Sequence, residues 1–330
     1  MATPFDFATS QSPPGDQPAG TLRNRRVGVL YLADRNYHSI TEIAIASLLF
    51  HNALPISVHF FQVGYSQAVA APISSFAEQN GHRIEIHKLS NQDLRFGDVQ
   101  RRGAHTYVSE AALLKGSAID ALAADYDYLI YIDGDVVCFR ELGLAHIGAF
   151  EQIMAAVPDF SVAAGYEKST EAANSYFNSG VLLINCAVWR ATSAFELYVE
   201  RVVQHADHCD FMEDCGAHDQ CALNMVADGD WARLPLTWNA QKIVSHTRLW
   251  RDAVLRHYTG PKKFLPITNW ACDDREYKLL TRLEDQFGLP IKSRRPYDFG
   301  LAYWLNSLRR HGHVVRMQAT IDRLEREALA

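Results

Sequence analysis

The chain has 330 residues, of which 48% are hydrophobic and 21% are charged, and its net charge is −6. This length is sufficient for a full α/β core, and the composition is that of an ordinary soluble globular protein. The acidic balance argues against nucleic acid as the main partner, and no apolar run reaches the ~18 residues that a membrane-spanning helix needs.

The first 26 residues are rich in Pro, Gly, Ser, Thr and Gln, and they contain no apolar signal-peptide core. We expect residues 1–26 to form a disordered leader, and we expect the protein to be cytoplasmic.

Strands and helices alternate in the part of the chain that follows. Apolar runs predict the strands, and apolar residues at helical spacing predict the helices. The predicted strands cover residues 26–33, 56–63 and 83–88, and the predicted helices cover residues 41–50, 72–80 and 111–124. This order predicts a doubly wound, mainly parallel sheet with helices on both faces, whose ligands bind beyond the carboxyl ends of the strands. Asp34 follows the first strand at such an end.

The segment Tyr128-Leu-Ile-Tyr-Ile-Asp133-Gly-Asp135 is a predicted buried strand that ends in two aspartates. We expect Gly134 to let the backbone turn there, so that the two carboxylates converge on one hard cation such as Mg²⁺ or Mn²⁺. Asp-x-Asp alone is weak evidence, because similar triplets occur in solvated turns. Charge directly after an apolar strand is costly unless it is used, so this setting favours a metal site that leaves positions for the phosphates of a nucleotide diphosphate.

The second half continues the same fold. Apolar runs predict strands over residues 161–165 and 180–185, and helical spacing predicts helices over residues 194–205 and 219–227. No low-complexity linker divides the chain after the leader. We therefore expect one catalytic domain over residues 27–270 and a C-terminal helical extension over residues 271–330.

From residue 292 onward the chain is basic and aromatic. The basic residues are Lys292, Arg294, Arg295, Arg309, Arg310, Arg316, Arg323 and Arg326, and the interspersed apolar ones are Phe299, Tyr303, Trp304 and Leu305. Such a stretch suits peripheral attachment to an anionic membrane surface, here the inner face of the membrane. The alternative is a helix that packs on the domain with solvated charges.

Six cysteines are present, and without a secretory signal we expect free thiols rather than disulfides. A group of soft metal ligands lies close together in the sequence: His205, His208, Cys209, Cys215, His218 and Cys221. Ligands at this density are compatible with a structural zinc ion. The Cys-x₂-Cys spacing of a compact zinc knot is absent, so ordinary core or loop residues are the other interpretation.

Five segments occur in an order that is typical of one enzyme family. They are Leu32–Tyr37, Asp133–Asp135, Phe177–Asn185, His218–Asn224 and His257–Lys263. Over roughly residues 27–265 the chain resembles glycosyltransferase family 8, which contains retaining, metal-dependent transferases that use UDP-hexoses, among them bacterial lipopolysaccharide galactosyl- and glucosyltransferases. The resemblance implies a GT-A-like fold, a mixed and mainly parallel sheet flanked by helices.

The resemblance also assigns the metal and nucleotide contacts. By it, Asp133, Asp135 and His257 hold Mn²⁺ or Mg²⁺. The nucleotide-facing segment contains Ala33, Asp34, Asn36 and Tyr37, where Asp34 accepts hydrogen bonds from the uracil region and Tyr37 stacks on the base. Gly134 lies between the metal ligands, and Gly260 and Lys263 meet the diphosphate. Two carboxylates and a neutral imidazole bind Mn²⁺ acceptably, and diphosphate oxygens fill the remaining positions.

The sugar-facing residues follow in the same way. The resemblance places Asn178, with Ser179 and Gly180, against the donor sugar, Asp219 on sugar hydroxyls, and the amide of Gln220 at the β-side of the sugar. Lys115 stands where the family usually has an arginine that contacts the donor, so the charge is kept and the fork geometry is lost. Phe264 and Leu265 replace the usual Pro-Trp, and His218 replaces a glutamine.

The resulting hypothesis is a retaining hexosyltransferase that moves galactose or glucose from UDP-galactose or UDP-glucose to a glycan or glycolipid acceptor. Because an amide is a poor nucleophile, front-face displacement is favoured, with the departing UDP helping to take the acceptor proton.

Two alternatives to this function remain. A nucleotidyltransferase also uses paired aspartates, but it favours a Gly-rich basic loop near the first strand. A degenerate sugar-nucleotide-binding protein is the non-enzymatic alternative, although Asp133, Asp135 and His257 are all present.

Overall fold

The computed structural model describes residues 21–22, 25–90, 110–207, 209–212, 218–260, 273–289, 304–305 and 308–328. The predicted leader, residues 1–26, lies almost entirely outside them, and the expected boundary near residue 270 does as well. Within the described residues, no helix is both long and apolar enough to cross a membrane.

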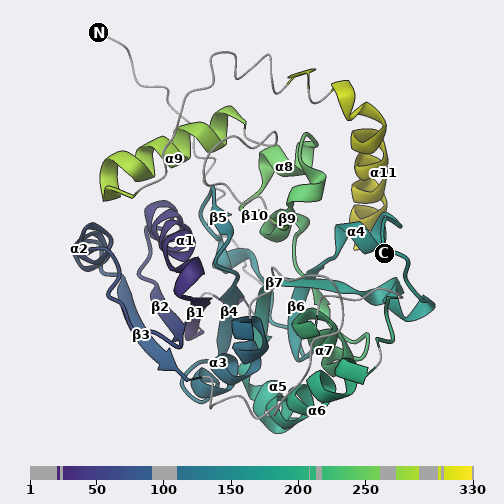
Figure 1. The fold of residues 1–330 in the computed structure, drawn as a ribbon, viewed down its shortest axis with the longest axis horizontal. Coiled ribbons are helices and arrows are strands. Elements are labelled where there is room, and N and C mark those ends of the chain that lie inside the picture. Colours follow the sequence, from purple (N-terminus) through teal and green to yellow (C-terminus); the bar gives the residue numbers. More distant parts are fainter. Residues whose placement is uncertain are drawn as a thin grey trace.

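A seven-stranded mixed sheet forms the centre of the molecule (Figure 1). Its strands, in spatial order, are β3 (Arg83–Leu89), β2 (Ser57–Val63), β1 (Val27–Asp34), β4 (Tyr128–Ile132), β7 (Phe177–Asn185), β6 (Met154–Pro158) and β8 (Ala232–Arg233). Neighbouring strands run parallel from β3 to β4 and again between β6 and β8, whereas β7 is antiparallel to both β4 and β6. The prediction of a mixed, mainly parallel sheet is confirmed.

Both faces of the sheet are buried, because the central strands β4 and β7 are buried at every position. Successive residues of a strand point to opposite faces, so Val29 and Tyr31 of β1 join one core while Leu30 and Leu32 join the other. The helices over the first core include α1 (His38–His51), α2 (Ala71–Gln79), α8 (Arg248–Asp252) and α9 (Asp274–Phe287). Those over the second are α3 (Lys115–Leu122), α5 (Cys186–Ala191), α6 (Ala194–Asp207) and α7 (His218–Ala227). Two-sided helix cover was predicted from the alternating pattern and is confirmed.

One predicted strand is wrong. Residues 161–165 were expected to be a strand, but the strand of this region is β6, which ends at Pro158, and α4 (Phe160–Ala163) follows it. The Asp159 carboxylate accepts hydrogen bonds from the backbone N–H groups of Ser161 and Val162, at 2.9 and 3.2 Å. A short apolar run has no helical or strand period of its own, so this N-cap decides the local structure.

A second, three-stranded sheet is formed by β5 (Val136–Cys138), β10 (Leu255–His257) and β9 (Ala240–Gln241), in that order. Strand β5 begins directly after the Asp-x-Asp turn that follows β4, and β10 runs antiparallel to it. The register pairs His257 with Val136. This small sheet therefore brings a residue from late in the chain next to the end of β4.

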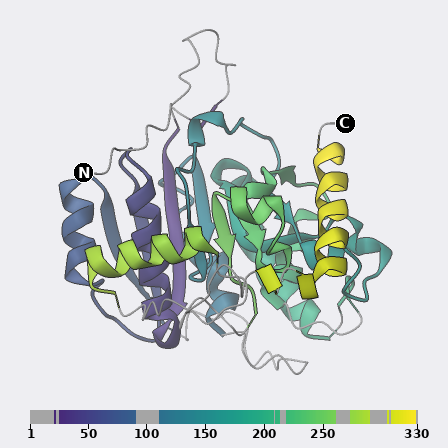
Figure 2. The ribbon, with the colours of Figure 1, turned by 90° about the horizontal axis from the view of Figure 1, so that it is seen from above.

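The C-terminal helices pack against the domain. Helix α9 lies across α1 and α2, and α11 (His311–Glu327) lies along the opposite side of the molecule beside α4 (Figure 2). A buried, bidentate ion pair from Arg256 to Asp273, with N–O distances of 3.0 and 2.7 Å, joins β10 to the N-cap of α9. The buried guanidinium of Arg256 is tolerated because it is paired with this carboxylate. The ion pair also fixes the position at which α9 begins.

Candidate active site

The carboxyl end of β4 carries three potential metal ligands. His257 Nε2 lies 3.6 Å from Asp133 Oδ2 and 3.4 Å from Asp135 Oδ1, and one ligand atom from each of the three residues lies within 4.8 Å of the others. Asp135 and His257 are buried, whereas the Asp133 side chain is 29% exposed. The ligand set therefore opens to solvent on the side of Asp133.

The hydrogen bonds of His257 fix its tautomer. Its Nδ1 atom lies 3.1 Å from Asn178 Oδ1 and 3.0 Å from Asn239 Oδ1. Amide oxygens only accept hydrogen bonds, so Nδ1 must carry the proton, and the lone pair of a neutral imidazole then lies on Nε2. This is the nitrogen that faces the two carboxylates. Outer-shell acceptors of this kind commonly orient a histidine that binds a metal.

Two glycines leave room for this arrangement. A Cβ atom on Gly180 would lie 2.1 Å from His257 Cε1 and 2.9 Å from Asp133 Oδ2. A Cβ atom on Gly134 would lie 2.2 Å from Thr41 Oγ1. The backbone does turn at Gly134, where Val136 N donates to Asp133 O at 3.0 Å, but the φ of Gly134 is not positive. Close approach of α1, rather than a left-handed backbone, excludes a side chain there.

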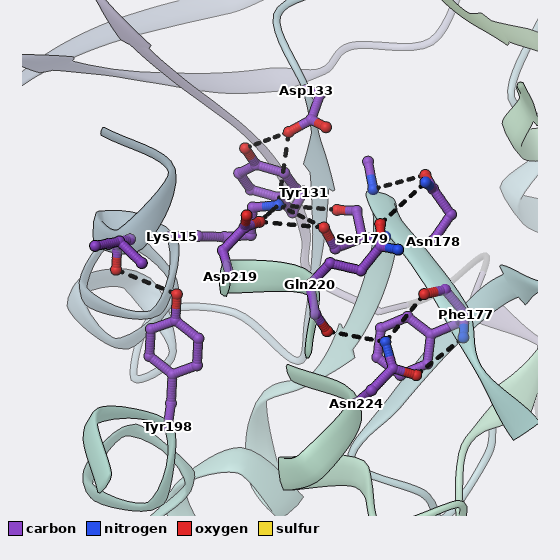
Figure 3. A network of polar contacts seen from close by, with 12 residues as sticks. Lys115, Tyr131, Asp133, Phe177, Asn178, Ser179, Tyr198, Asp219, Gln220 and Asn224 are labelled. Atoms are coloured by element: carbon purple, nitrogen blue, oxygen red, sulfur yellow. Dashed lines mark hydrogen bonds and ion pairs between the residues drawn. The ribbon is translucent and has the colours of Figure 1, made fainter. Parts of the chain in front are cut away.

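Lys115 is a fully buried cation at the start of α3 (Figure 3). Its Nζ atom lies 2.8 Å from Asp219 Oδ2 and 3.6 Å from Asp133 Oδ1. It also donates to the carbonyl and hydroxyl oxygens of Ser179, both at 3.1 Å, and lies over the ring of Tyr131. Burial lowers the pKa of Lys115, but Asp133 and then Asp219 outweigh it, so the net shift is upward and the ammonium form is favoured.

A second network fixes the amide of Gln220 (Figure 3). Its Oε1 atom accepts from Ser179 N at 3.1 Å and from Asn178 Nδ2 at 3.0 Å, and its Nε2 atom donates to Asp159 Oδ2 at 3.1 Å. Asn178 Nδ2 also donates to Asp159, at 3.2 Å. Asp159 therefore has two structural roles: its Oδ2 atom accepts from Gln220 and Asn178, and its Oδ1 atom caps α4. The network links α7, β7 and the end of β6.

The charges near the ligand set favour a divalent cation. Three carboxylates, from Asp133, Asp135 and Asp219, face one ammonium group, that of Lys115. Lys115 makes its shortest ion pair with Asp219, which leaves Asp133 and Asp135 beside the His257 ring. Carboxylate oxygens with one imidazole nitrogen suit Mn²⁺ or Mg²⁺, and two negative charges balance a divalent ion. The residues present fit such an ion.

Comparisons with known proteins place the chain in a family. A family model described as glycosyl transferase family 8 matches residues 28–264. The chain belongs to this family. The resemblance predicted from the five sequence segments is confirmed, and the protein is a glycosyltransferase.

Two relatives of this glycosyltransferase come from Escherichia coli (strain K12). The chain is 25% identical to a lipopolysaccharide 1,2-glucosyltransferase over 74% of each chain, and 24% identical to the lipopolysaccharide glucosyltransferase WaaO over 76% of this chain and 75% of that one. A solved structure of the galactosyltransferase LgtC, in complex with donor and acceptor sugar analogues, superposes with a TM-score of 0.59. The alignment is 23% identical and covers 84% of this chain and 99% of LgtC. That likeness confirms the GT-A fold.

The nucleotide-facing residues predicted for the glycosyltransferase lie at the same sheet edge as the metal ligands. Strand β1 is parallel to β4 and next to it, so Asp34, the last residue of β1, and Asp133, which follows β4, both lie at carboxyl ends. Asp34 Oδ1 accepts from the backbone N–H groups of Asn36 and Tyr37, at 2.9 and 3.1 Å, and so caps the short 3₁₀ turn that carries them. Ala33 is buried in β1. Contacts of these residues with a nucleotide stay predictions.

Other predictions have different outcomes. Asn178 was expected to touch the donor sugar, and within the protein it forms hydrogen bonds with His257, Asn239, Gly180, Gln220 and Asp159. The contact of Asn178 with the sugar stays a prediction. Its side chain orients His257 and Gln220. Gly260 follows β10 closely, whereas Lys263, Phe264 and Leu265 lie outside the described residues.

Sequence reasoning missed three residues of the site: Asp159, Asn239 and Tyr131, whose hydroxyl donates to Asp133 Oδ1 at 2.7 Å. Asp159 and Asn239 stand in no motif, and each acts through an outer-shell hydrogen bond. Tyr131 was counted only as an apolar strand residue. Its position two residues before Asp133, on the same face of the strand, is the signal that could have found it.

Proposed function

We propose that this glycosyltransferase is a metal-dependent, retaining hexosyltransferase that uses UDP-galactose or UDP-glucose. Its acceptor is proposed to be a glycan or a lipid-linked saccharide. The observation that carries the proposal is the ligand set of Asp133, Asp135 and His257, in which the Nε2 atom faces both carboxylates. The names of the two glucosyltransferase relatives and of the galactosyltransferase LgtC support a hexose donor.

In this proposal a bound Mn²⁺ or Mg²⁺ ion offsets the negative charge that builds on the UDP leaving group. Lys115 adds a buried positive charge at the same edge of the sheet, 3.6 Å from Asp133. By holding Asp219 at 2.8 Å, it also fixes the carboxylate that we assign to the sugar hydroxyls. Preorganised charges of this kind stabilise a transition state because they need not reorient during the reaction.

The proposed route has no covalent sugar–enzyme intermediate. Gln220 Oε1, the atom that would have to attack, accepts two hydrogen bonds within the protein. These bonds direct it toward Asn178 and the backbone of Ser179, and an amide is in any case a poor nucleophile. We therefore infer front-face displacement, in which the acceptor hydroxyl attacks the anomeric carbon on the side that UDP leaves, and a phosphate oxygen of UDP takes the hydroxyl proton.

The alternative of a nucleotidyltransferase has little support. That chemistry would favour a glycine-rich basic loop after β1. The residues found there, Arg35–Tyr37, form a 3₁₀ turn without glycine, capped by Asp34. The alternative of a degenerate binding protein predicts UDP binding without turnover, and the following assay separates it from the proposal.

The test is UDP release in the presence of Mn²⁺ from UDP-galactose, UDP-glucose and UDP-GlcNAc without acceptor. It compares the native chain with Asp135→Ala and with a control, Asp230→Ala, which removes an exposed carboxylate from the turn before β8. We expect slow hydrolysis of one hexose donor that is lost in Asp135→Ala and kept in Asp230→Ala.

If no donor is hydrolysed, calorimetric titration with UDP distinguishes a binding protein from a chain that has no nucleotide site. Mn²⁺-dependent UDP binding without turnover, also when lipopolysaccharide-type acceptors are added, would leave a sugar-nucleotide-binding protein and overturn the transferase proposal. No UDP binding with or without metal would overturn the nucleotide site as well.

We also propose that the protein attaches peripherally to a membrane surface through its C-terminal segment. Not all of the predicted basic residues are available for this. Arg316 donates to Ala164 O and Gly165 O, and Arg323 donates to Ala163 O, so both hold α11 against the end of α4 and the residues that follow it. The exposed residues that support the proposal are Trp304, Leu305 and Leu308, next to the exposed Arg309.

Flotation with vesicles that contain anionic lipids tests this attachment on the full chain. We expect the native protein to float and Trp304→Glu/Leu308→Glu to remain in the bottom fraction. The control Val203→Glu changes an exposed apolar residue of α6. Equal flotation of the native chain and the double variant would contradict the proposal.

A further inference from the structure

Two cysteines and a histidine come together between helices α6 and α7, apart from the ligand set at the end of β4. His205 lies in the last turn of α6, Cys209 follows that helix, and Cys221 lies in the first turns of α7. One ligand atom of each lies within 4.8 Å of the others, and the two Sγ atoms are 3.8 Å apart. His205 and Cys221 are buried, and Cys209 is half-buried.

These distances match a tetrahedral zinc site. Two thiolates that bind one Zn²⁺ ion at about 2.3 Å in tetrahedral geometry lie about 3.8 Å from each other, and this is the Sγ–Sγ distance found here. A disulfide would need about 2.05 Å. His205 lies in the last turn of α6 and Cys209 lies two residues beyond its end, so both lie at the same end of this helix.

The surroundings of the cluster are those of a structural metal site. Cys221 lies in a small apolar core with Val162, Ala173, Tyr176 and Phe211. The Tyr176 hydroxyl is 3.0 Å from Cys221 Sγ and can donate a hydrogen bond to a thiolate at that position. A charged sulfur in an apolar core is costly unless a cation and hydrogen bonds compensate it. A zinc ion would supply the cation.

The cluster also lies between segments whose relative position matters. Residues 209–212 are held against residues 169–170, where Thr170 Oγ1 donates to Asp210 O and Thr170 N donates to Phe211 O at 2.9 Å. On the other side, Cys221 directly follows Asp219 and Gln220 in α7. Asp219 pairs with Lys115, and Gln220 joins the network with Asn178 and Asp159.

We propose that His205, Cys209 and Cys221 form a structural zinc site that joins the end of α6 to the start of α7. The three side chains supply three of four tetrahedral ligands and leave the fourth position to another ligand. Soft thiolates select zinc, whereas Asp133, Asp135 and His257 offer a set that suits Mn²⁺ or Mg²⁺. The zinc site would hold the first turn of α7 in place and with it the side chains of Asp219 and Gln220.

Metal analysis of the full chain tests the proposal. The protein is expressed with zinc in the medium, freed of loosely bound metal by gel filtration, and measured by mass spectrometry for zinc per chain. We expect about one zinc ion per native chain. We expect a nearly complete loss of that zinc in Cys209→Ser and in Cys221→Ser.

The control variant is Cys186→Ser. Cys186 is also a buried thiol, but burial raises its pKa to about 12 and it lies outside the cluster. It is expected to keep the full zinc content. Replacement of zinc by Co²⁺ then identifies the ligands, because only Co²⁺–thiolate bonds give an intense charge-transfer band in the near ultraviolet. That band must be absent in Cys209→Ser and present in Cys186→Ser and in Asp135→Ala.

Zinc content equal in the native chain and in both cysteine variants would overturn the proposal, and so would a native chain that binds no zinc after reconstitution. Thiol counting covers the remaining alternative, since a disulfide between Cys209 and Cys221 in the freshly purified protein would also overturn it. The measurement on the native chain decides the matter even if one variant fails to fold. None of these outcomes depends on whether the proposed hexosyl transfer is correct.

Discussion

Two clusters of three ligands can be compared within this glycosyltransferase. One consists of Asp133, Asp135 and His257, and the other of His205, Cys209 and Cys221. The first combines residues that are more than 120 positions apart in the sequence, whereas the second draws its residues from one short segment. The first has hard oxygen ligands at the carboxyl end of β4, while the second has soft sulfur ligands between two helices. The kind of donor atom therefore assigns a different metal to each cluster.

Their surroundings differ as well. Asp133 keeps a side chain that is 29% exposed, and buried polar groups such as Asn178, Asn239 and Lys115 surround the first cluster. The second cluster borders a small apolar core. An ion that must take part in chemistry needs positions open to substrate, whereas an ion that joins two helices does not. This comparison gives each cluster a different expected response to substitution.

The largest effect is expected from Asp135→Asn. The amide keeps an oxygen at the position but removes one of the two negative charges that favour a divalent ion. Because metal stabilisation of a leaving group amounts to several kcal/mol, we expect hexosyl transfer to fall by at least ~10³-fold. Transfer is measured by UDP release.

The other half of this comparison is the zinc content of the same variant. It should remain that of the native chain, because Asp135 does not belong to the second cluster. A variant that loses both activity and zinc would show that the two clusters are not independent.

The next effect concerns stability. Lys115→Met removes the cation that lies 2.8 Å from Asp219 and leaves a buried carboxylate without its partner. Breaking a buried ion pair in this way costs about 3–5 kcal/mol, so we expect the free energy of unfolding in urea to fall by about that amount. Lys115→Arg restores the charge and serves as the control. A Lys115→Met variant as stable as the native chain would mean that Asp219 is not stabilised by Lys115.

Much of this fold could be predicted from the sequence because its signals are local. Apolar runs and helical spacing identify β1, β2, β3 and β4 and the helices between them. The strand predicted over residues 161–165 failed for a physical reason. The apolar run there has no period of its own, and a single side chain, Asp159, caps the helix that forms instead.

The candidate site was predictable to the extent that its ligands stand in motifs. Asp133, Asp135 and His257 were named from such segments, and the structure brings them together. The orienting residues were not predictable in this way. Asn239 contacts His257 through a fold in which β9 and β10 are neighbours, and no local pattern encodes that contact.

A smaller effect, on metal affinity, is expected from substituting the residues that orient ligands in each cluster. Each cluster offers one such substitution, and the two can be compared directly. Asn239→Ala removes one acceptor from His257 Nδ1, and Tyr176→Phe removes the hydroxyl beside Cys221 Sγ. Outer-shell substitutions of this kind typically weaken metal affinity by about 10–100-fold. We expect Asn239→Ala to weaken Mn²⁺ binding only, and Tyr176→Phe to weaken zinc binding only.

Calorimetric titration with Mn²⁺ and competition with a zinc chelator measure the two affinities. The opposite assignment, with Tyr176→Phe changing Mn²⁺ binding, would contradict the division of the molecule into a catalytic and a structural metal site.

The smallest effect concerns the pH dependence of stability. The difference in free energy of unfolding between the native chain and Lys115→Arg should not change with pH. The pKa of Lys115 is raised above its usual 10.5, because Asp133 and Asp219 together outweigh the opposing effect of burial. A group with a raised folded-state pKa stabilises fully below its unfolded pKa, and the contribution is lost only as pH rises through the folded pKa. The guanidinium of Lys115→Arg stays charged at every accessible pH. From about pH 7 to about pH 9.5 the free energies of unfolding of the native chain and of Lys115→Arg should therefore differ by a constant amount.

Urea denaturation at several pH values checks this expectation. A native chain that loses stability relative to Lys115→Arg within that range would show that Lys115 gives up its proton there. The carboxylates would then be too weakly coupled to Lys115 to hold its charge.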